Sequence, residues 1–180
     1  MELLSLGVLG TSTEENERRL PIHPAHVDRI DPDLRARMYL ERGYGTRYGV
    51  SDEHLAPLVA GMGTRDELIQ STEIVLLPKP TLADVQALRD GQVLWGWPHA
   101  VQDVPLTQLA IDKRLTLIAW EAMNHWTPEG SFMVHVFHMN NELAGYSSVL
   151  HALALEGTTG HYGRQLSAVV IGFGNTARGA

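Results

Sequence analysis

Short apolar runs alternate with helical segments along most of the chain, and this alternation constrains the fold more than any other feature. Six runs have the composition of strands: 4–9, 36–40, 73–77, 92–97, 115–120 and 168–171. Most are continuously apolar, which is typical of strands buried on both faces of a parallel sheet. The pattern predicts an α/β fold in which helices cover both faces of a parallel sheet, a three-layer Rossmann-like or flavodoxin-like arrangement.

The segments between these runs carry helix signals. Thr64–Glu67 and Thr81–Asp84 have the spacing of a capping box or its close relative, and 51–60 and 103–114 are also predicted to be helical. The longest candidate covers 139–156. Its small and apolar residues predict that it is buried, and Gly157 is expected to end it.

Composition limits the function classes. The chain has 180 residues, a formal net charge of −7 and no cysteine. This charge gives no basic field for nucleic acid or an anionic membrane, and without cysteine there is no disulfide or thiolate metal site. No apolar run approaches the roughly 18 residues of a membrane span, and the N-terminus lacks the charged region of a secretory signal. We therefore expect a cytoplasmic protein without a nucleic-acid or membrane partner.

The C-terminal segment carries a dinucleotide-binding fingerprint. Gly172, Gly174 and Ala177 match G-x-G-x-x-G/A: the first allows a tight turn, the second lets backbone approach a pyrophosphate, and the third lets helix and strand pack closely. The predicted cofactor is NAD or NADP. The helix whose N-terminus would hold the pyrophosphate, and the acidic residue about 20 positions further on, are both expected to lie beyond Ala180. For the free 180-residue chain we therefore expect neither useful nicotinamide binding nor turnover.

These features predict three parts. Residues 1–138 are expected to form the substrate domain, 139–165 a connecting helix and loop, and 166–180 the start of a truncated NAD(P)-binding domain.

Two basic residues follow predicted strands, where an open parallel sheet binds its ligands. Arg19 lies in the charged segment 14–24 and has the planar side chain that holds a carboxylate through two hydrogen bonds. Lys79 lies between two prolines that restrict its backbone, and it is one of only two lysines among fourteen basic residues. The alternatives are a solvated charged loop for Arg19 and an exposed lysine on a rigid loop for Lys79.

A third candidate, His99, follows the tryptophan-rich run 95–98. Histidine exchanges a proton near neutral pH, and tryptophans exclude water around a small ligand. The alternative is a structural loop histidine. Glu121 follows the next predicted strand and is a further candidate for the same cleft, or else a helix cap or salt-bridge partner.

Two histidine pairs have a spacing of three, His23 with His26 and His135 with His138. Neither comes with a third ligand in a known motif, so we predict no metal site.

Taken in order, four segments resemble the N-terminal part of the alanine dehydrogenase and pyridine nucleotide transhydrogenase family. Residues 16–24 are similar to its N-E-x-R-V-x-L-x-P start, and Tyr44-Gly45 with 50–52 to its G-x-G…F-S-D stretch. Residues 77–80 are similar to its V-K-E-P, and 88–94 to its L-(R/K)-x-G-Q segment. The resemblance covers essentially all 180 residues.

The resemblance implies roles for three residues. Arg19 matches the arginine that binds the substrate carboxylate, Lys79 the lysine that helps to hold the oxo acid, and His99 the histidine that donates and accepts protons. It implies an NAD(P)-dependent oxidoreductase that aminates a 2-oxo acid such as pyruvate reductively, with the reverse deamination. Relatives usually assemble, so a homo-oligomer is also expected.

The sequence departs from the alanine dehydrogenase pattern around His99. Gly96-Trp97-Pro98-His99 is similar to the G-W-T-H of carboxyethylornithine synthase, an opine-forming relative that joins pyruvate to ornithine. The amine therefore stays open between ammonia, ornithine and lysine. A third alternative, of another class, is a non-catalytic module that binds a small carboxylate or a partner.

Overall fold

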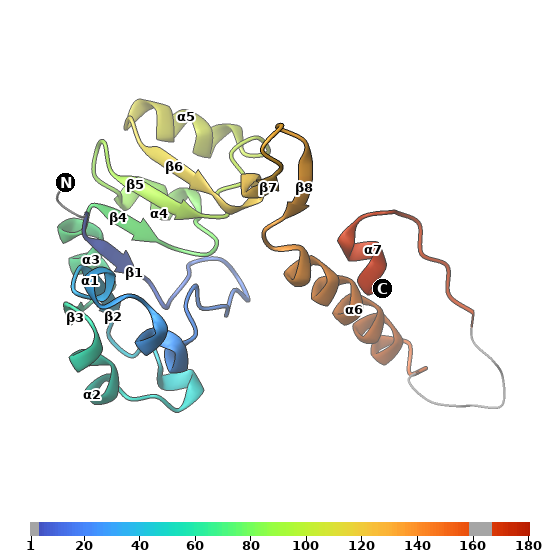
Figure 1. Cartoon of the computed structure of the whole chain (residues 1–180), viewed down its shortest axis with the longest axis horizontal. Helices are drawn as coiled ribbons and strands as arrows, with labels where there is room; N and C mark the ends of the chain where they lie inside the picture. The colour runs from blue at the N-terminus through green and yellow to red at the C-terminus, as the bar shows by residue number, and fades with distance from the viewer. Residues whose placement is uncertain (1–3, 159–166) are drawn as a thin grey trace. The chain divides into compact units, whose positions relative to one another are not determined.

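The computed structural model describes residues 4–158 and 167–180 of the chain (Figure 1). The chain divides into two compact units, Met1–Glu121 and Ala122–Ala180. The functional division into 1–138, 139–165 and 166–180 stays a prediction.

A six-stranded parallel sheet forms the centre of the first unit, in the order β3-β2-β1-β4-β5-β6 (Figure 1). Its strands are β1 Leu6–Val8, β2 Met38–Glu41, β3 Gly61–Gly63, β4 Ile74–Leu76, β5 Val93–Gly96 and β6 Thr116–Ala119. This is the strand order of the Rossmann doubly wound fold, whose direction of winding switches between β1 and β4. The predicted α/β class is confirmed, as are five predicted strands; β3 was not predicted.

The helices between the strands are short. They are α1 Pro32–Arg35, α2 Asp52–Leu55, α3 Arg65–Ser71, α4 Leu82–Ala87 and α5 Val104–Asp112, with 3-10 turns η1 Pro24–Arg29, η2 Thr46–Tyr48, η3 Ala56–Leu58 and η4 Trp120–Ala122. Both predicted capping boxes are present, at the starts of α3 and α4. The single helix predicted over 51–60 was wrong. Pro57 lacks an N–H and its ring clashes with the preceding turn, so α2 gives way to η3.

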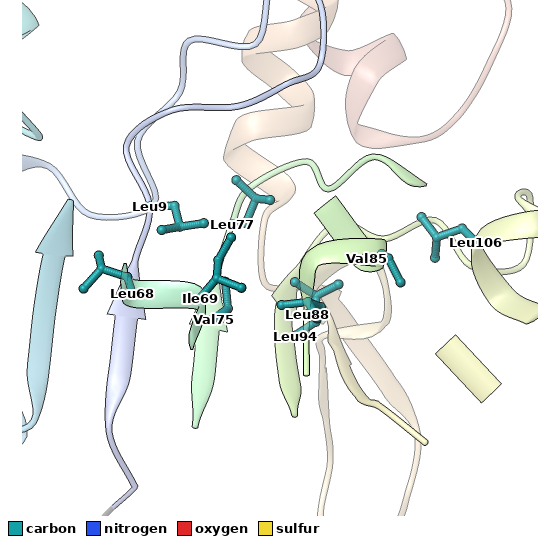
Figure 2. Packing of buried hydrophobic residues seen from close by; sticks show 9 residues of the cluster. All are labelled: Leu9, Leu68, Ile69, Val75, Leu77, Val85, Leu88, Leu94 and Leu106. Atoms are coloured by element: carbon teal, nitrogen blue, oxygen red, sulfur yellow. The ribbon is translucent and has the colours of Figure 1, made fainter. Parts of the chain in front are cut away.

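The hydrophobic core lies where α3, α4 and α5 pack on one face of this sheet. Figure 2 shows nine of its buried residues: Leu9, Leu68, Ile69, Val75, Leu77, Val85, Leu88, Leu94 and Leu106. Val75 is in register with Leu94, so the two side chains share that face. Val8, Leu40 and Leu76 lie in one register row, and Leu76 directly follows Val75, so this row points to the opposite face of the sheet. All three are buried, which is the two-sided burial expected of a parallel sheet.

The second unit holds an antiparallel pair and two helices. These are β7 Asn124–Trp126, β8 Phe132–His135, α6 His138–Leu155 and α7 Asn175–Gly179. The β7–β8 pair was not predicted. The helix α6 was predicted. Gly157 follows it with a left-handed φ of +66°, as expected of a residue that ends a helix.

Three predictions for this unit were wrong. The helix expected beyond Ala180 begins earlier, as α7 at Asn175, directly after the glycine turn. The helix α6 is not buried: Gly145 is its one buried residue, while Met139, Leu143, Tyr146 and Leu155 are all more than half exposed. Residues 168–171 are not a strand, because a strand pairs with a neighbouring strand and none of the described strands pairs with these residues. Most of the glycine-rich segment 157–164 lies outside the described residues.

Within the described ranges, no helix combines the length and the apolar character needed to cross a membrane.

Candidate functional site

The loops after β1 and β4 meet at the point where the sheet reverses its winding, which is where open α/β sheets bind ligands. A buried carboxylate from β2 fixes the start of the first loop. Glu41 accepts hydrogen bonds from the amides of Gly10 and Thr11, at 2.7 and 2.9 Å, and from the Thr11 hydroxyl at 2.6 Å. The loop therefore leaves β1 along a defined path.

A second buried carboxylate, Asp84 of α4, connects the two loops. It accepts hydrogen bonds from the hydroxyl of Thr13, at 2.8 Å, and from the amide of Thr81, at 2.8 Å. Arg65 of α3 forms an ion pair with it at 2.5 Å. Because Asp84 holds residues on either side of the switch point, it fixes the spacing between the loop carrying Arg19 and the loop carrying Lys79.

Arg19 and Lys79 line one pocket of about 460 Å³. The other lining residues are Glu14, Glu15, Asn16, Glu17, Arg18 and Tyr48. Lys79 Nζ lies 2.9 Å from Glu14 Oε1, and both side chains are partly exposed. The sequence predictions for Arg19 and Lys79 thus converge on a single cavity, in which Lys79 is paired with a carboxylate.

Arg19 is paired in the same way with Glu17. Its Nε lies 2.9 and 3.1 Å from the two carboxylate oxygens, and its Nη2 also contacts that carboxylate. These hydrogen bonds lower the pKa of the Glu17 carboxyl and raise that of the Arg19 guanidinium. Arg19 Cζ lies 4.7 Å from the ring centroid of Trp97, within the range of a cation–π contact.

Hydrogen bonds beyond the strand ends fix the backbone beside Lys79. The Leu77 amide donates to the Trp95 carbonyl at 3.0 Å, and the Trp97 amide donates to the Pro78 carbonyl at 2.9 Å. A Cβ at Gly96 would lie 1.9 Å from the Leu77 carbonyl oxygen, so this close approach requires glycine. Trp97 therefore contacts Arg19 from a loop held against the lysine loop.

His99 lies two residues beyond Trp97 and is not among the residues that line the pocket of Arg19 and Lys79. Its φ is +47°, a left-handed conformation that few non-glycine residues adopt. The His99 amide donates to Glu121 Oε1 at 2.8 Å, and its carbonyl accepts from the Gln102 amide at 2.8 Å. Its backbone is therefore fixed on both sides.

Tryptophans pack beside this loop. Trp120 is buried, with its ring centroid 4.5 Å from that of Trp97 and 6.5 Å from that of Trp95. Such apolar surface limits water around the polar groups nearby.

Four acidic residues at the site were not predicted to be site residues: Glu14, Glu17, Glu41 and Asp84, the last of which was predicted only as part of a capping box. Glu14 and Glu17 stand in an acidic run beside Arg19, which is the one local signal for them.

The fingerprint glycines lie in the second unit, where a pocket of about 520 Å³ is lined by residues that include Gly172, Gly174 and Ala177. Gly172 has a φ of +152°, and a Cβ there would lie 3.1 Å from that of Ala177. Gly174 precedes α7 as its N-cap without a side-chain cap, and a Cβ on it would meet no atom within 4 Å. The backbone at this turn is thus exposed. The strand that precedes a dinucleotide fingerprint is absent from the described residues, so the cofactor-binding role of these residues stays a prediction.

The two histidine pairs have other contacts. The rings of His23 and His26 are 4.9 Å apart, and His23 Nδ1 accepts a hydrogen bond from the Ala25 amide. His138 Nδ1 contacts the His135 carbonyl oxygen at 3.1 Å. Among the residues with described positions, no group of three or more His, Cys, Asp or Glu has an arrangement that could hold a metal ion.

Residues 9–144 match the family model described as alanine dehydrogenase/PNT, N-terminal domain. The chain is 24% identical to an N(5)-(carboxyethyl)ornithine synthase of Clostridium botulinum over 92% of its own length and 53% of that protein's. It is 28% identical to an alanine dehydrogenase of Methanococcus maripaludis over 61% of its own length and 30% of that protein's. The chain thus spans about half the length of the first relative, and the second match covers less than a third of that protein.

Two solved structures share the fold. An L-alanine dehydrogenase superposes with a TM-score of 0.67 at 21% identity, covering 87% of this chain and 43% of that one. A transhydrogenase from Sinorhizobium meliloti superposes with a TM-score of 0.64 at 20% identity, covering 94% of this chain and 48% of that one.

Proposed function

Because the chain belongs to the family of the alanine dehydrogenase/PNT N-terminal domain, we propose that it supplies the 2-oxo-acid site of an NAD(P)-dependent oxidoreductase acting on amino acids. The proposed reaction is the reductive amination of a 2-oxo acid such as pyruvate, together with its reverse.

One observation carries this proposal. Arg19 and Lys79 line a single pocket at the carboxyl edge of the sheet, and each already holds a carboxylate of the loop after β1. Arg19 and Lys79 together suit a ligand that presents a carboxylate and a neighbouring carbonyl oxygen, as a 2-oxo acid does, and Arg18 is a third cation in the lining.

Arg19 and Lys79 have different roles in the proposed reaction. Arg19 orients the substrate by hydrogen bonds to its carboxylate, a role for which a planar guanidinium is suited. Lys79 places its ammonium at the carbonyl oxygen and stabilises the negative charge that grows there as the amine attacks.

Proton transfers fall to His99. Attack by the amine gives a carbinolamine, which loses water to form an iminium; His99 takes the proton from the nitrogen and returns one to the departing hydroxyl. Its ring makes no hydrogen bond to other residues that the structure describes, so the imidazole is not committed to a structural partner.

The backbone around Gly172, Gly174 and Ala177 would hold the nicotinamide dinucleotide by its pyrophosphate. When bound, this cofactor supplies the hydride that reduces the iminium carbon.

Substitution in the full-length protein tests the assignment. Lys79→Ala and His99→Ala should each abolish NAD(P)H oxidation with pyruvate and amine. Lys113→Ala is the matched control, since that lysine bonds the carbonyls of Gln86 and Leu88 away from this pocket. Near-normal rates in both Lys79→Ala and His99→Ala would contradict the site.

A second candidate is an opine-type synthase that joins pyruvate to ornithine. The Gly96–His99 segment and the match to a carboxyethylornithine synthase over 92% of the chain favour it. Turnover with ornithine or lysine but not ammonia would support the synthase; turnover with ammonia alone would support the dehydrogenase. Pyruvate binding without turnover with any amine would support the non-catalytic module instead.

A further inference from the structure

Glu121 lies in η4, immediately after β6, and its carboxylate reaches the loop after the neighbouring strand β5. Oε1 accepts the amide hydrogen of His99 at 2.8 Å. Oε2 is buried and has no hydrogen-bond partner among the described residues. No described basic side chain forms an ion pair with it, so a salt-bridge role does not account for this carboxylate.

The bond from Glu121 acts where the backbone conformation is unfavourable. A left-handed φ of +47° in a residue with a side chain persists only when surrounding contacts impose it. Three bonds do so here: Trp97 N–H to the Pro78 carbonyl, His99 N–H to Glu121, and Gln102 N–H to the His99 carbonyl. Of the three, the bond to Glu121 is the one with a carboxylate acceptor, and carboxylate bonds are the stronger kind.

We infer that Glu121 is a positioning residue, whose carboxylate fixes the backbone of His99 and thereby the direction in which the imidazole leaves the loop. The inference rests on the proposed function, because it assigns Glu121 a part in the proton transfers of His99. Glu121 acts through the His99 amide.

Amide hydrogen exchange of the 180-residue chain, followed by NMR, tests this positioning without any enzyme assay. In Glu121→Ala the His99 amide should exchange about tenfold faster or more, because its acceptor is gone. Glu121→Gln keeps the shape and an acceptor oxygen but loses the charge, so its increase should be smaller. Glu129→Ala, which removes a carboxylate from the exposed turn between β7 and β8, should leave the His99 amide unchanged.

A His99 amide with the wild-type exchange rate and chemical shift in Glu121→Ala would overturn the inference. If that variant does not fold, Glu121→Gln carries the test, and an unchanged His99 amide shift in it has the same meaning.

Kinetics of the full-length protein then distinguish a positioning role of Glu121 from a role in fold stability alone. Glu121→Gln should lower kcat about tenfold or more and change the KM for pyruvate by less than about twofold, since Arg19 and Lys79 keep their contacts. A raised KM with unchanged kcat would contradict the inference. An inactive wild-type protein would refute the proposed function, whereas the amide exchange would still decide whether Glu121 positions His99.

Discussion

Single residues allow the loops of this sheet to approach one another closely. At Gly96 there is no room for a side chain. A Cβ at this position would lie 1.9 Å from the Leu77 carbonyl oxygen, which is backbone and has no rotamer to move away. The β4 and β5 ends would have to separate, and with them the loops carrying Lys79 and His99.

Gly96→Ala should therefore lower the free energy of unfolding by about 3 kcal/mol or more, as overpacking against backbone does. Urea unfolding measures the loss. Gly174→Ala is the control, with open space around its Cβ and an expected loss below about 1 kcal/mol. Similar losses in the two variants would contradict the close approach at Gly96.

The Glu17–Arg19 pair makes stability depend on pH with a definite sign. Arg19 lowers the pKa of Glu17 in the folded chain, so the pair stabilises the fold above the unfolded-state pKa and is lost as the pH falls through the lowered value. Between about pH 5 and pH 3, unfolding free energy should fall less in Glu17→Gln than in the wild type. The exposed Glu129→Gln should follow the wild type, and parallel curves for Glu17→Gln and wild type would contradict the pairing.

At the scale of elements, capping boxes fix where α3 and α4 begin, and the box of α4 ends the loop that carries Lys79. Thr64 and Thr81 each accept an amide hydrogen of the third helical residue, Glu67 and Asp84, and those carboxylates bond back to the cap amides. The box at Thr81 also places the buried Asp84 between the two site loops. Both boxes follow from sequence spacing alone, and both were predicted.

Thr64→Ala should lower the unfolding free energy by about 1 kcal/mol, since it removes one acceptor from the first turn of α3. Ser71→Ala at the other end of α3 loses a hydroxyl bonded to the Glu67 carbonyl, where water can replace it, so its loss should stay within about 0.5 kcal/mol. Urea denaturation compares the two, and equal losses would show that the cap is not what stabilises the helix.

Across the whole molecule, strands that are buried on both faces are predictable, because burial leaves an apolar run in the sequence. Strands that are defined only by hydrogen bonds to a neighbouring strand are not. Runs such as 73–77 are apolar because both faces are covered, so their strands were predictable. β3 is Gly-Met-Gly, and only its bonds to β2 define it. Residues 168–171 show the converse: the run is strongly apolar, but no strand in the described part of the chain pairs with it.

Some residues of the candidate site were predictable from the sequence and others were not. Arg19 and Lys79 were placed at one edge because parallel strands end there, and the structure puts both in one pocket. Their partners Glu14 and Glu17 depend on how the loop after β1 folds back, which no strand or helix pattern encodes. The link from Glu121 to His99 likewise joins loops after two different strands, so spacing alone does not reveal it.

Titration of the 180-residue chain with pyruvate, followed by NMR, tests the central claim most directly, since it needs neither cofactor nor turnover. Pyruvate should shift the amide signals of the loop 14–19 and of Lys79 in a saturable way. Arg19→Gln and Lys79→Gln should each weaken that binding about tenfold or more, because each loses a charged contact to the ligand. Saturable binding of equal strength in the wild type and both variants, or shifts confined to residues outside this pocket, would contradict a 2-oxo-acid site built on Arg19 and Lys79.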